Sequence, residues 1–401
     1  SEPIAIASIE LFPHVDFVSY ESVKDSYDKN GYKPAEKGHA IKIEAEIPNA
    51  SSSQTVYPLE DVSSSLNSPS DSTRTLLNVI GGDKWQTSGQ WVRYKFTPEV
   101  SGLYNIVARY KQNVNDGLFS SRQIYIYGGQ YNGIPFSEAT KTRFNYSDEW
   151  VVEAMGDGEN TFEFYFEAGV EYTVVFEVSL GSMGDMVRRV ETALKTINAA
   201  YLNIIKLTGT SPDNYRDYGF TRVLPDAVTD MKLMSNELYA IAEYLEKEAG
   251  IKGSNIATLD RVAWLLDEMS SDEDVIAKNL SELKSYIGNL ATWISTAKCQ
   301  PLLVDYFMIQ SSEDKLPRAN AGFFSEFGYE MRKFFMSFIR NYDRMGSQHE
   351  ITEEDEAIEV WLAYGRDQSQ VIRNLVNNNF TPETGIMVDL KLVAGGTLLP
   401  S

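Results

Sequence analysis

The spacing of hydrophobic residues changes abruptly along this chain, and these changes limit the folds that it can adopt. Between residues 39 and 180, apolar and polar residues alternate in short runs separated by turn residues, which is typical of antiparallel strands. After Gly181 the apolar residues recur every three or four positions as far as Ile294, which predicts amphipathic helices. The apolar run at residues 302–309 then predicts one further strand.

That last strand decides how the two parts are connected. A strand needs partners for its backbone N–H and C=O groups, and a helical bundle offers none. We therefore expect residues 301–312 to return to the sheets formed by residues 39–181. Residues 182–300 then form a helical bundle inserted before the last strand. The expected fold class is a multidomain α+β protein in which an antiparallel β-sandwich of the jelly-roll kind carries an inserted helical bundle.

The remaining segments have their own patterns. Residues 1–38 predict an N-terminal helical segment, and residues 313–345 predict an aromatic amphipathic helix that packs in a core or an interface. A membrane-facing or sugar-facing role is the alternative for that helix. Residues 346–357 are polar and acidic and predict a linker. Residues 358–401 show a strand, a helix and a strand, which predicts the first βαβ unit of an α/β domain. One such unit cannot cover its own sheet, so we expect this domain to be incomplete here.

The charge excludes two classes of partner. The chain has 36 Lys and Arg against 57 Asp and Glu, for a net charge of −21, whereas nucleic acids and anionic membranes attract clustered cations. A neutral sugar or a cation such as calcium fits this charge, and solubility alone is the alternative explanation. No apolar run approaches the roughly 20 residues of a transmembrane helix, so we expect no membrane span in this chain.

Catalytic motifs are not recognisable. The single cysteine, Cys299, cannot form an internal disulfide, and the three histidines, which a catalytic cysteine would need as partners, lie far from it in sequence. We find no phosphate-binding loop, zinc signature or nucleophile elbow. Acidic residues are plentiful, but no segment places two of them in a predicted aromatic cleft. We therefore predict that the chain is not an enzyme.

Scattered motifs in the strand region resemble the galactose-binding-like β-sandwich carbohydrate-binding modules. In order along the chain, the motifs are Glu44-Ala-Glu46, Gly81-Gly-Asp-Lys-Trp85, Gly89-Gln-Trp-Val-Arg-Tyr94, Gly102-Leu-Tyr104, Ala108-Arg-Tyr110 and Val304-Asp-Tyr306. The resemblance implies that Glu44, Glu46 and Asp305 help to hold a structural calcium ion, because calcium takes several oxygen ligands at once. The alternative is that Glu44 and Glu46 simply face solvent.

The C-terminal segment resembles the opening of the extracellular solute-binding protein of a bacterial carbohydrate ABC transporter. The resemblance rests on Glu359-Val-Trp-Leu-Ala-Tyr-Gly-Arg-Asp-Gln368, on Phe380-Thr-Pro-Glu-Thr-Gly-Ile386 and on Leu392-Val-Ala-Gly-Gly-Thr-Leu-Leu-Pro-Ser401. It implies a periplasmic-binding-protein-like α/β domain placed after the sandwich and the bundle. It also implies a cell-surface lipoprotein of a Gram-positive bacterium, anchored through a cysteine upstream of this chain, with the transporter permease as its partner.

Candidate sugar-binding residues follow from the chemistry of carbohydrates. Aromatic rings stack on the C–H faces of sugars, and neighbouring polar groups bond the hydroxyls. At predicted strand ends and loops the candidates are Trp85, Asn113, Phe119, Arg122 and Trp150. Packing in the core is the alternative for Trp85 and Trp150, and it is favoured for Trp91 and Tyr94, which lie within a predicted strand.

A second candidate region follows the first strand of the α/β unit. Ligands of open α/β folds bind beyond the carboxyl ends of the strands, so Arg366 and Asp367 are candidates for contacts with a sugar. The alternative for Asp367 is to cap the helix that follows.

Together these features predict a non-catalytic protein that binds an oligosaccharide or a monosaccharide for a sugar importer. Two alternatives stay open. The chain could be the carbohydrate-binding accessory region of a glycan-degrading enzyme, or the sandwich and bundle could be a scaffold without a ligand.

Overall fold

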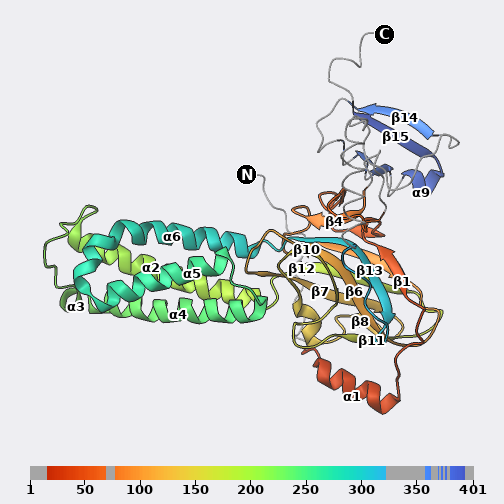
Figure 1. Ribbon diagram of the computed structural model, residues 1–401, viewed down its shortest axis with the longest axis horizontal. Helices are drawn as coiled ribbons and strands as arrows, with labels where there is room; N and C mark the ends of the chain where they lie inside the picture. The colour runs from red at the N-terminus through yellow and green to blue at the C-terminus, as the bar shows by residue number, and fades with distance from the viewer. Residues whose placement is uncertain are drawn as a thin grey trace, which may run out of the picture.

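The computed structural model describes residues 16–68, 77–321, 357–362, 369, 372–373, 375–376 and 380–392. These residues form two antiparallel sheets, a bundle of long helices and a separate pair of parallel strands (Figure 1). The expectation of antiparallel sheets combined with a helical bundle in an α+β protein is therefore confirmed.

The first sheet has seven strands. It consists of β1 (Ile41–Glu44), β3 (Pro58–Leu59), β4 (Val79–Gly82), β6 (Gly102–Gln112), β10 (Ser147–Ala154), β11 (Glu163–Phe166) and β13 (Leu302–Ser311). The order is β10-β6-β13-β4-β3, with β1 also paired to β13 and β11 to β6. Strand β13 thus lies in the middle of the sheet, although more than 100 residues separate it from β12, the strand before it in the chain.

The second sheet has six strands. It consists of β2 (Ala50–Ser51), β5 (Trp91–Phe96), β7 (Phe119–Gly128), β8 (Tyr131–Gly133), β9 (Thr142–Asn145) and β12 (Tyr172–Ser179). The order is β2-β5-β12-β7-β8, with β9 also paired to β7.

The two sheets pack face to face through aromatic side chains. Every second residue of β5 and β12 is buried, as the alternation predicts. The ring of Phe307 on β13 lies 4.3 Å from that of Phe176 and 5.3 Å from that of Tyr94, both on the second sheet. Burying each such ring contributes roughly 1.5–3 kcal/mol, so this layer is the main stabilising core of the two-sheet region.

Helix α1 (Tyr20–Asn30) closes one end of this core. Ser19 caps its first turn by accepting a hydrogen bond from the Ser22 N–H, and Gly31 ends it in the left-handed conformation that glycine favours. The Tyr20 ring packs against the rings of Phe136 and Phe162. The short helix η1 (Ser137–Lys141) follows Phe136.

The bundle contains four long helices. They are α2 (Met183–Thr208), α4 (Pro225–Ala249), α5 (Ser254–Ser271) and α6 (Ile276–Lys298), joined with the aid of α3 (Phe220–Val223) and η2 (Glu273–Val275). Each long helix packs against two others, α2 against α4 and α6, and α5 against the same two. The apolar positions predicted from the helical period, such as Val190 and Ile197, are fully buried in this core.

The bundle is held to the sheets by direct contacts. The Asn115 side chain donates to the backbone C=O of Cys299 at 2.9 Å, and the Ser254 N–H donates to the Asp116 carboxylate at 2.8 Å. A Cβ atom added to Gly253 would lie only 2.4 Å from the backbone nitrogen of Gly117. The two backbones therefore approach so closely that only glycine fits.

The C-terminal residues form a smaller unit. Strands β14 (Ala357–Leu362) and β15 (Met387–Leu392) pair in parallel, and the short helix α9 (Thr381–Thr384) precedes β15. A parallel pair requires a crossover connection, which agrees with the predicted strand–helix–strand pattern. Most of that crossover lies outside the described residues.

Other predicted segments are described only in part. Residues 16–38 contain α1, and residues 1–15 lie outside the described chain. Residues 313–321 form turns and irregular backbone instead of the start of the predicted amphipathic helix. The rest of that helix and nearly all of the predicted linker lie outside the described residues.

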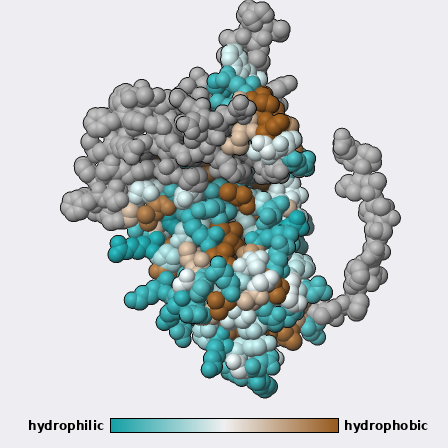
Figure 2. Space-filling model, turned by 90° about the vertical axis from the view of Figure 1, so that its right-hand side faces the viewer, coloured by the Kyte–Doolittle hydropathy of each residue, from teal (hydrophilic) through white to brown (hydrophobic). Residues whose placement is uncertain are grey.

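Two observations concern the surface. Among the described residues, no helix combines the length and the apolar character that a membrane crossing requires. On the face turned to the viewer in Figure 2, hydrophobic residues are scattered among hydrophilic ones.

Candidate functional site

Two of the predicted sugar-binding residues, Trp85 and Arg122, form a buried pair. Trp85 is 0% exposed, and the Arg122 guanidinium lies 4.1 Å from the centre of its ring. Arg122 also donates hydrogen bonds to the backbone C=O groups of Trp85 and Gln300. Burial lowers the pKa of Arg122 to about 9, so it stays protonated at neutral pH. The pair thus joins the loop before β5 to the start of β13, and Trp85 has no exposed face for a sugar.

The other predicted residues are spread over the molecule. Phe119 is buried in the bundle-side core with Arg143 over its ring at 5.0 Å, and Asn113 is exposed. Trp150 is 3% exposed and packs elsewhere, against Arg109. These positions agree with the core alternative for Trp85 and Trp150. Of the five residues Asn113 is the exposed one, and sugar binding by this set stays a prediction. Arg366 and Asp367 lie outside the described residues.

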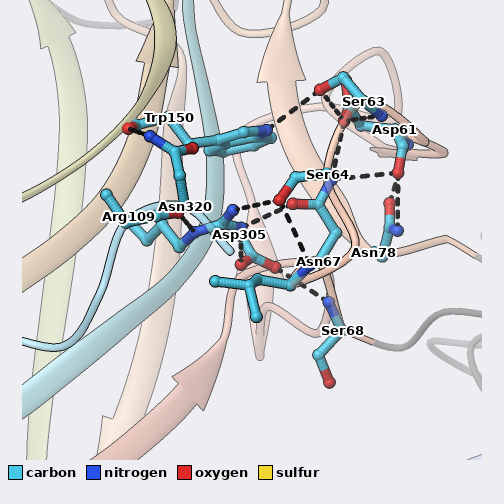
Figure 3. A network of polar contacts seen from close by, with 12 residues as sticks. Asp61, Ser63, Ser64, Asn67, Ser68, Asn78, Arg109, Trp150, Asp305 and Asn320 are labelled. Carbon is cyan, nitrogen blue, oxygen red and sulfur yellow. Dashed lines mark hydrogen bonds and ion pairs between the residues drawn. The ribbon is translucent and has the colours of Figure 1, made fainter. Parts of the chain in front are cut away.

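The predicted calcium ligand Asp305 lies in a buried polar network on the first sheet (Figure 3). Asp305 on β13 and Arg109 on β6 are 0% and 1% exposed, and their charged groups meet at 2.5 Å. The same guanidinium donates to the Asn67 side chain at 2.6 Å, to Ser64 at 3.0 Å and to the Ala319 C=O at 2.9 Å.

Aromatic and amide groups extend this network. The Trp150 ring covers the Arg109 guanidinium at 4.5 Å, and its indole N–H donates to Ser63 at 3.1 Å. The Asn67 side chain donates to the Asp61 carboxylate at 2.7 Å. The network, drawn in Figure 3, therefore fixes the loop of residues 61–68 and the segment at residues 319–320 to the first sheet.

These contacts bear on the predicted calcium ion. The Asp305 carboxylate already faces a cation, the Arg109 guanidinium, and oxygen acceptors surround that guanidinium. Within the part of the chain that the structure describes, no three His, Cys, Asp or Glu side chains gather closely enough to hold a metal ion. The described residues therefore do not fit calcium beside Asp305, and we derive no role for calcium. A calcium ion held by Glu44 or Glu46 stays a prediction.

Glu46 differs from the solvent-facing alternative. It is 1% exposed. Burial, followed by the nearby charges of Glu44 and Asp305, raises the pKa of its carboxyl to about 8. Burial also raises the pKa of Asp305, to about 6, while Arg109 lowers it. At neutral pH the Asp305 carboxyl is thus ionised beside Arg109, whereas Glu46 is largely protonated.

A depression that sequence reasoning missed lies on the outer face of the second sheet. It has a volume of about 600 Å³ and is lined by Trp91, Arg93, Tyr125, Tyr127, Thr173, Val175 and Glu177. These residues come from the neighbouring strands β5, β12 and β7. On each strand these are the alternate residues whose side chains point away from the aromatic core.

Strand register arranges the lining residues in three rows across the sheet. Trp91 lies beside Glu177, Arg93 beside Val175, and Thr173 beside Tyr127. Val175 also pairs with Tyr125, so a small apolar side chain forms the middle of the floor between Arg93 and that tyrosine. Trp91 and Tyr127 thus lie at opposite ends of the depression, and Tyr125 lies on one side of it.

Polar groups in the depression complement the rings. Gln123, next to the lining residues, donates its side-chain N–H to the Tyr125 hydroxyl at 3.0 Å. Burial, and after it the charge and hydrogen bond of Glu177, raise the pKa of Tyr125. Arg93 lines the depression, and no described carboxylate forms an ion pair with it. Its Nε is itself buried without a hydrogen-bond acceptor, so the groups that could meet a ligand are its terminal N–H groups.

The sequence does contain a signal for this site. Trp91, Arg93 and Lys95 alternate with Val92, Tyr94 and Phe96, so one of these two sets must face outward. The core position predicted for Tyr94 is confirmed, since it is 1% exposed. The core position predicted for Trp91 is wrong, because Trp91 lies on the opposite side of β5 from Tyr94 and lines the depression.

A second depression, of about 540 Å³, lies between α2 and α4 of the bundle. Its charged groups are already paired, Arg189 with Glu237 at 2.6 Å and Arg188 with Asp185. It has no aromatic lining residue. Because aromatic and unpaired polar groups are the features of ligand sites, the depression on the second sheet is the better candidate.

Comparisons with known proteins concern mainly the bundle. The family model of the bacterial solute-binding protein, 4-helix bundle domain, matches residues 185–297, which extend from α2 into α6. Among curated proteins, none matches the chain. One solved structure, a GH26-CBM35 β-(1,4)-mannanase from Podospora anserina, is 12% identical with a TM-score of 0.21 over 65% of this chain and 64% of that chain. A likeness this weak carries no argument, and this chain spans less than two thirds of that protein. The match of residues 185–297 supports a solute-binding protein.

Proposed function

We propose that this protein binds a carbohydrate on the outer face of its second sheet and serves as the extracellular solute-binding component of an ABC sugar importer. The observation that carries the proposal is the depression lined by Trp91, Tyr125 and Tyr127 together with Arg93 and Glu177. A neutral sugar requires aromatic rings that stack on its C–H faces, and it requires both hydrogen-bond donors and acceptors for its hydroxyl groups. The match of the bundle to solute-binding proteins supports the transport role.

The proposed activity is binding without turnover. Hydrolysis of a glycosidic bond usually needs two carboxyl groups on opposite sides of the bond. Among the described residues that line the depression, Glu177 is the one carboxylate. By this proposal the protein is a cell-surface lipoprotein that delivers its ligand to the permease of the importer.

The test is a thermal-shift and calorimetric screen of the whole chain. The probes are soluble oligosaccharides of glucan, mannan, xylan and galactan, since a bound ligand raises Tm by mass action. We expect one glycan class to raise Tm, and we expect Trp91→Ala to weaken its binding about tenfold, the effect of losing one stacking ring.

The matched control is Trp264→Ala. Trp264 lies on α5 of the bundle and is 56% exposed, so this variant also loses an accessible tryptophan but leaves the depression intact. Equal affinity of both variants for the glycan would refute the placement of the site. Release of reducing sugar ends by the wild type would refute the non-catalytic assignment.

A further inference from the structure

The spacing of the aromatic side chains contains information about the size of the ligand. Trp91 on β5 and Tyr127 on β7 belong to the first and third of the three rows, with β12 between their strands. Two strand intervals are about 10 Å, and four residues along a strand are about 14 Å, so their Cα atoms are about 17 Å apart. One sugar ring cannot stack on both.

The middle of the depression is polar as well as apolar. Tyr125 lies in the row of Arg93 and Val175, about 12 Å from Trp91 by the same spacing. Arg93 belongs to the same row and lines the depression, and no described carboxylate forms an ion pair with it. A ligand that reaches from Trp91 to Tyr127 therefore passes beside the Arg93 guanidinium, whose terminal N–H groups can donate to it.

From this arrangement we propose that the depression binds an extended oligosaccharide of at least three units, diagonally across β5, β12 and β7, with one subsite at Trp91, one at Tyr127 and a central unit bonded by Arg93. This inference rests on the proposed carbohydrate function. The volume of about 600 Å³ lies within the range of about 300–1,000 Å³ that is usual for small-molecule sites.

The alternative is a monosaccharide site centred on one ring. Tyr127 is 42% exposed and Trp91 is half-buried, so either could bind a single sugar by itself. In that case only one of the two rings would contribute to affinity, and further units of the ligand would add nothing. The two arrangements thus differ in how affinity depends on chain length.

The experiment is calorimetric titration of the whole chain with a series from monosaccharide to hexasaccharide of the glycan that raises Tm. We expect affinity to rise at least tenfold between the disaccharide and the tetrasaccharide. Trp91→Ala and Tyr127→Ala should each lower the affinity for the hexasaccharide about tenfold and abolish that rise, since each removes one stacking contact. Arg93→Met should weaken the binding of the trisaccharide and of longer oligosaccharides to the same extent.

Controls separate this inference from the function on which it rests. Trp264→Ala should bind the whole series like the wild type. Both tested rings lie outside the core, so unchanged circular dichroism and Tm without ligand would show that the variants are folded. A monosaccharide that binds as tightly as the hexasaccharide, or a hexasaccharide affinity unchanged by either variant, would overturn the extended site while leaving carbohydrate binding intact. If the wild type binds none of the glycans, the proposed function itself fails.

Discussion

Replacing Arg109 with methionine tests whether the buried polar network of the first sheet stabilises the fold. Methionine keeps an unbranched side chain but removes the donors to Asp305, Asn67, Ser64 and the Ala319 C=O. It also leaves the Asp305 carboxylate, which is 0% exposed, without its counter-ion. Breaking one partner of a buried ion pair costs about 3–5 kcal/mol.

We expect this loss in the unfolding of the two-sheet region. At roughly 2–4 °C per kcal/mol for domains of 150–250 residues, Tm should fall by about 10 °C. Urea unfolding followed by tryptophan fluorescence gives the free energy, and Trp150, which stacks on Arg109 at 4.5 Å, lies at the altered position. The loss should therefore appear in the same transition as the change in fluorescence.

Two further variants make this prediction sharp. Arg188→Met removes an exposed ion pair with Asp185 on α2, with side chains 75% and 62% exposed, and should cost less than about 1 kcal/mol. The double variant Arg109→Met with Asp305→Leu removes both charges and should recover most of the loss, because apolar pairs often replace buried ion pairs without cost. If Arg109→Met is no more harmful than Arg188→Met, the reasoning is refuted.

The remaining predictions concern other parts of the molecule. Because burial raises the pKa of Glu46 to about 8, the folded chain holds a proton there that the unfolded chain releases above about pH 4.3. The free energy of unfolding should thus fall as the pH rises from about 4.3 to 8, by up to ~1.4 kcal/mol per pH unit. Glu46→Gln should flatten that slope in urea titrations at several pH values, and an unchanged slope would contradict this assignment. Gly253→Ala should lower the free energy of unfolding by about 1–3 kcal/mol, because the added methyl group would clash with Gly117. Gly288→Ala on α6, with open space around it, should instead raise the free energy of unfolding by about 0.5–1 kcal/mol. Similar melting curves for both variants would refute the close packing between the bundle and the sheets. Chelation with EDTA should leave Tm unchanged if Arg109 is the cation beside Asp305, and a drop of several degrees would instead favour a bound metal.

Local sequence patterns determined the type of most elements. The two-residue alternation around Val92 and Tyr94 and the helical period around Val190 follow from which side of each element must be buried. The apolar run at residues 302–309 required a sheet, because a lone strand leaves its backbone groups without partners. These inferences depend only on the order of residues within each segment, so the sequence alone is enough to make them.

The exposure of individual aromatic residues was decided by tertiary structure. Trp85 and Trp150 are both buried, and each is covered by an arginine about 40 positions away in the chain. Nothing near either tryptophan in sequence announces that partner. Asp305 likewise meets an arginine 196 positions earlier, so the same acidic residue that suggested a calcium ligand faces a guanidinium.

The candidate site shows both contributions together. Alternation placed Trp91 and Arg93 on one side of their strand, but it could not say which side faced the core. Only the order β5-β12-β7, with β12 reaching its place from far along the chain, brings Tyr125, Tyr127 and Glu177 beside them. Because the order of strands in a sheet depends on pairing between distant segments, the sequence supplied the side chains, and the tertiary structure assembled them into one surface.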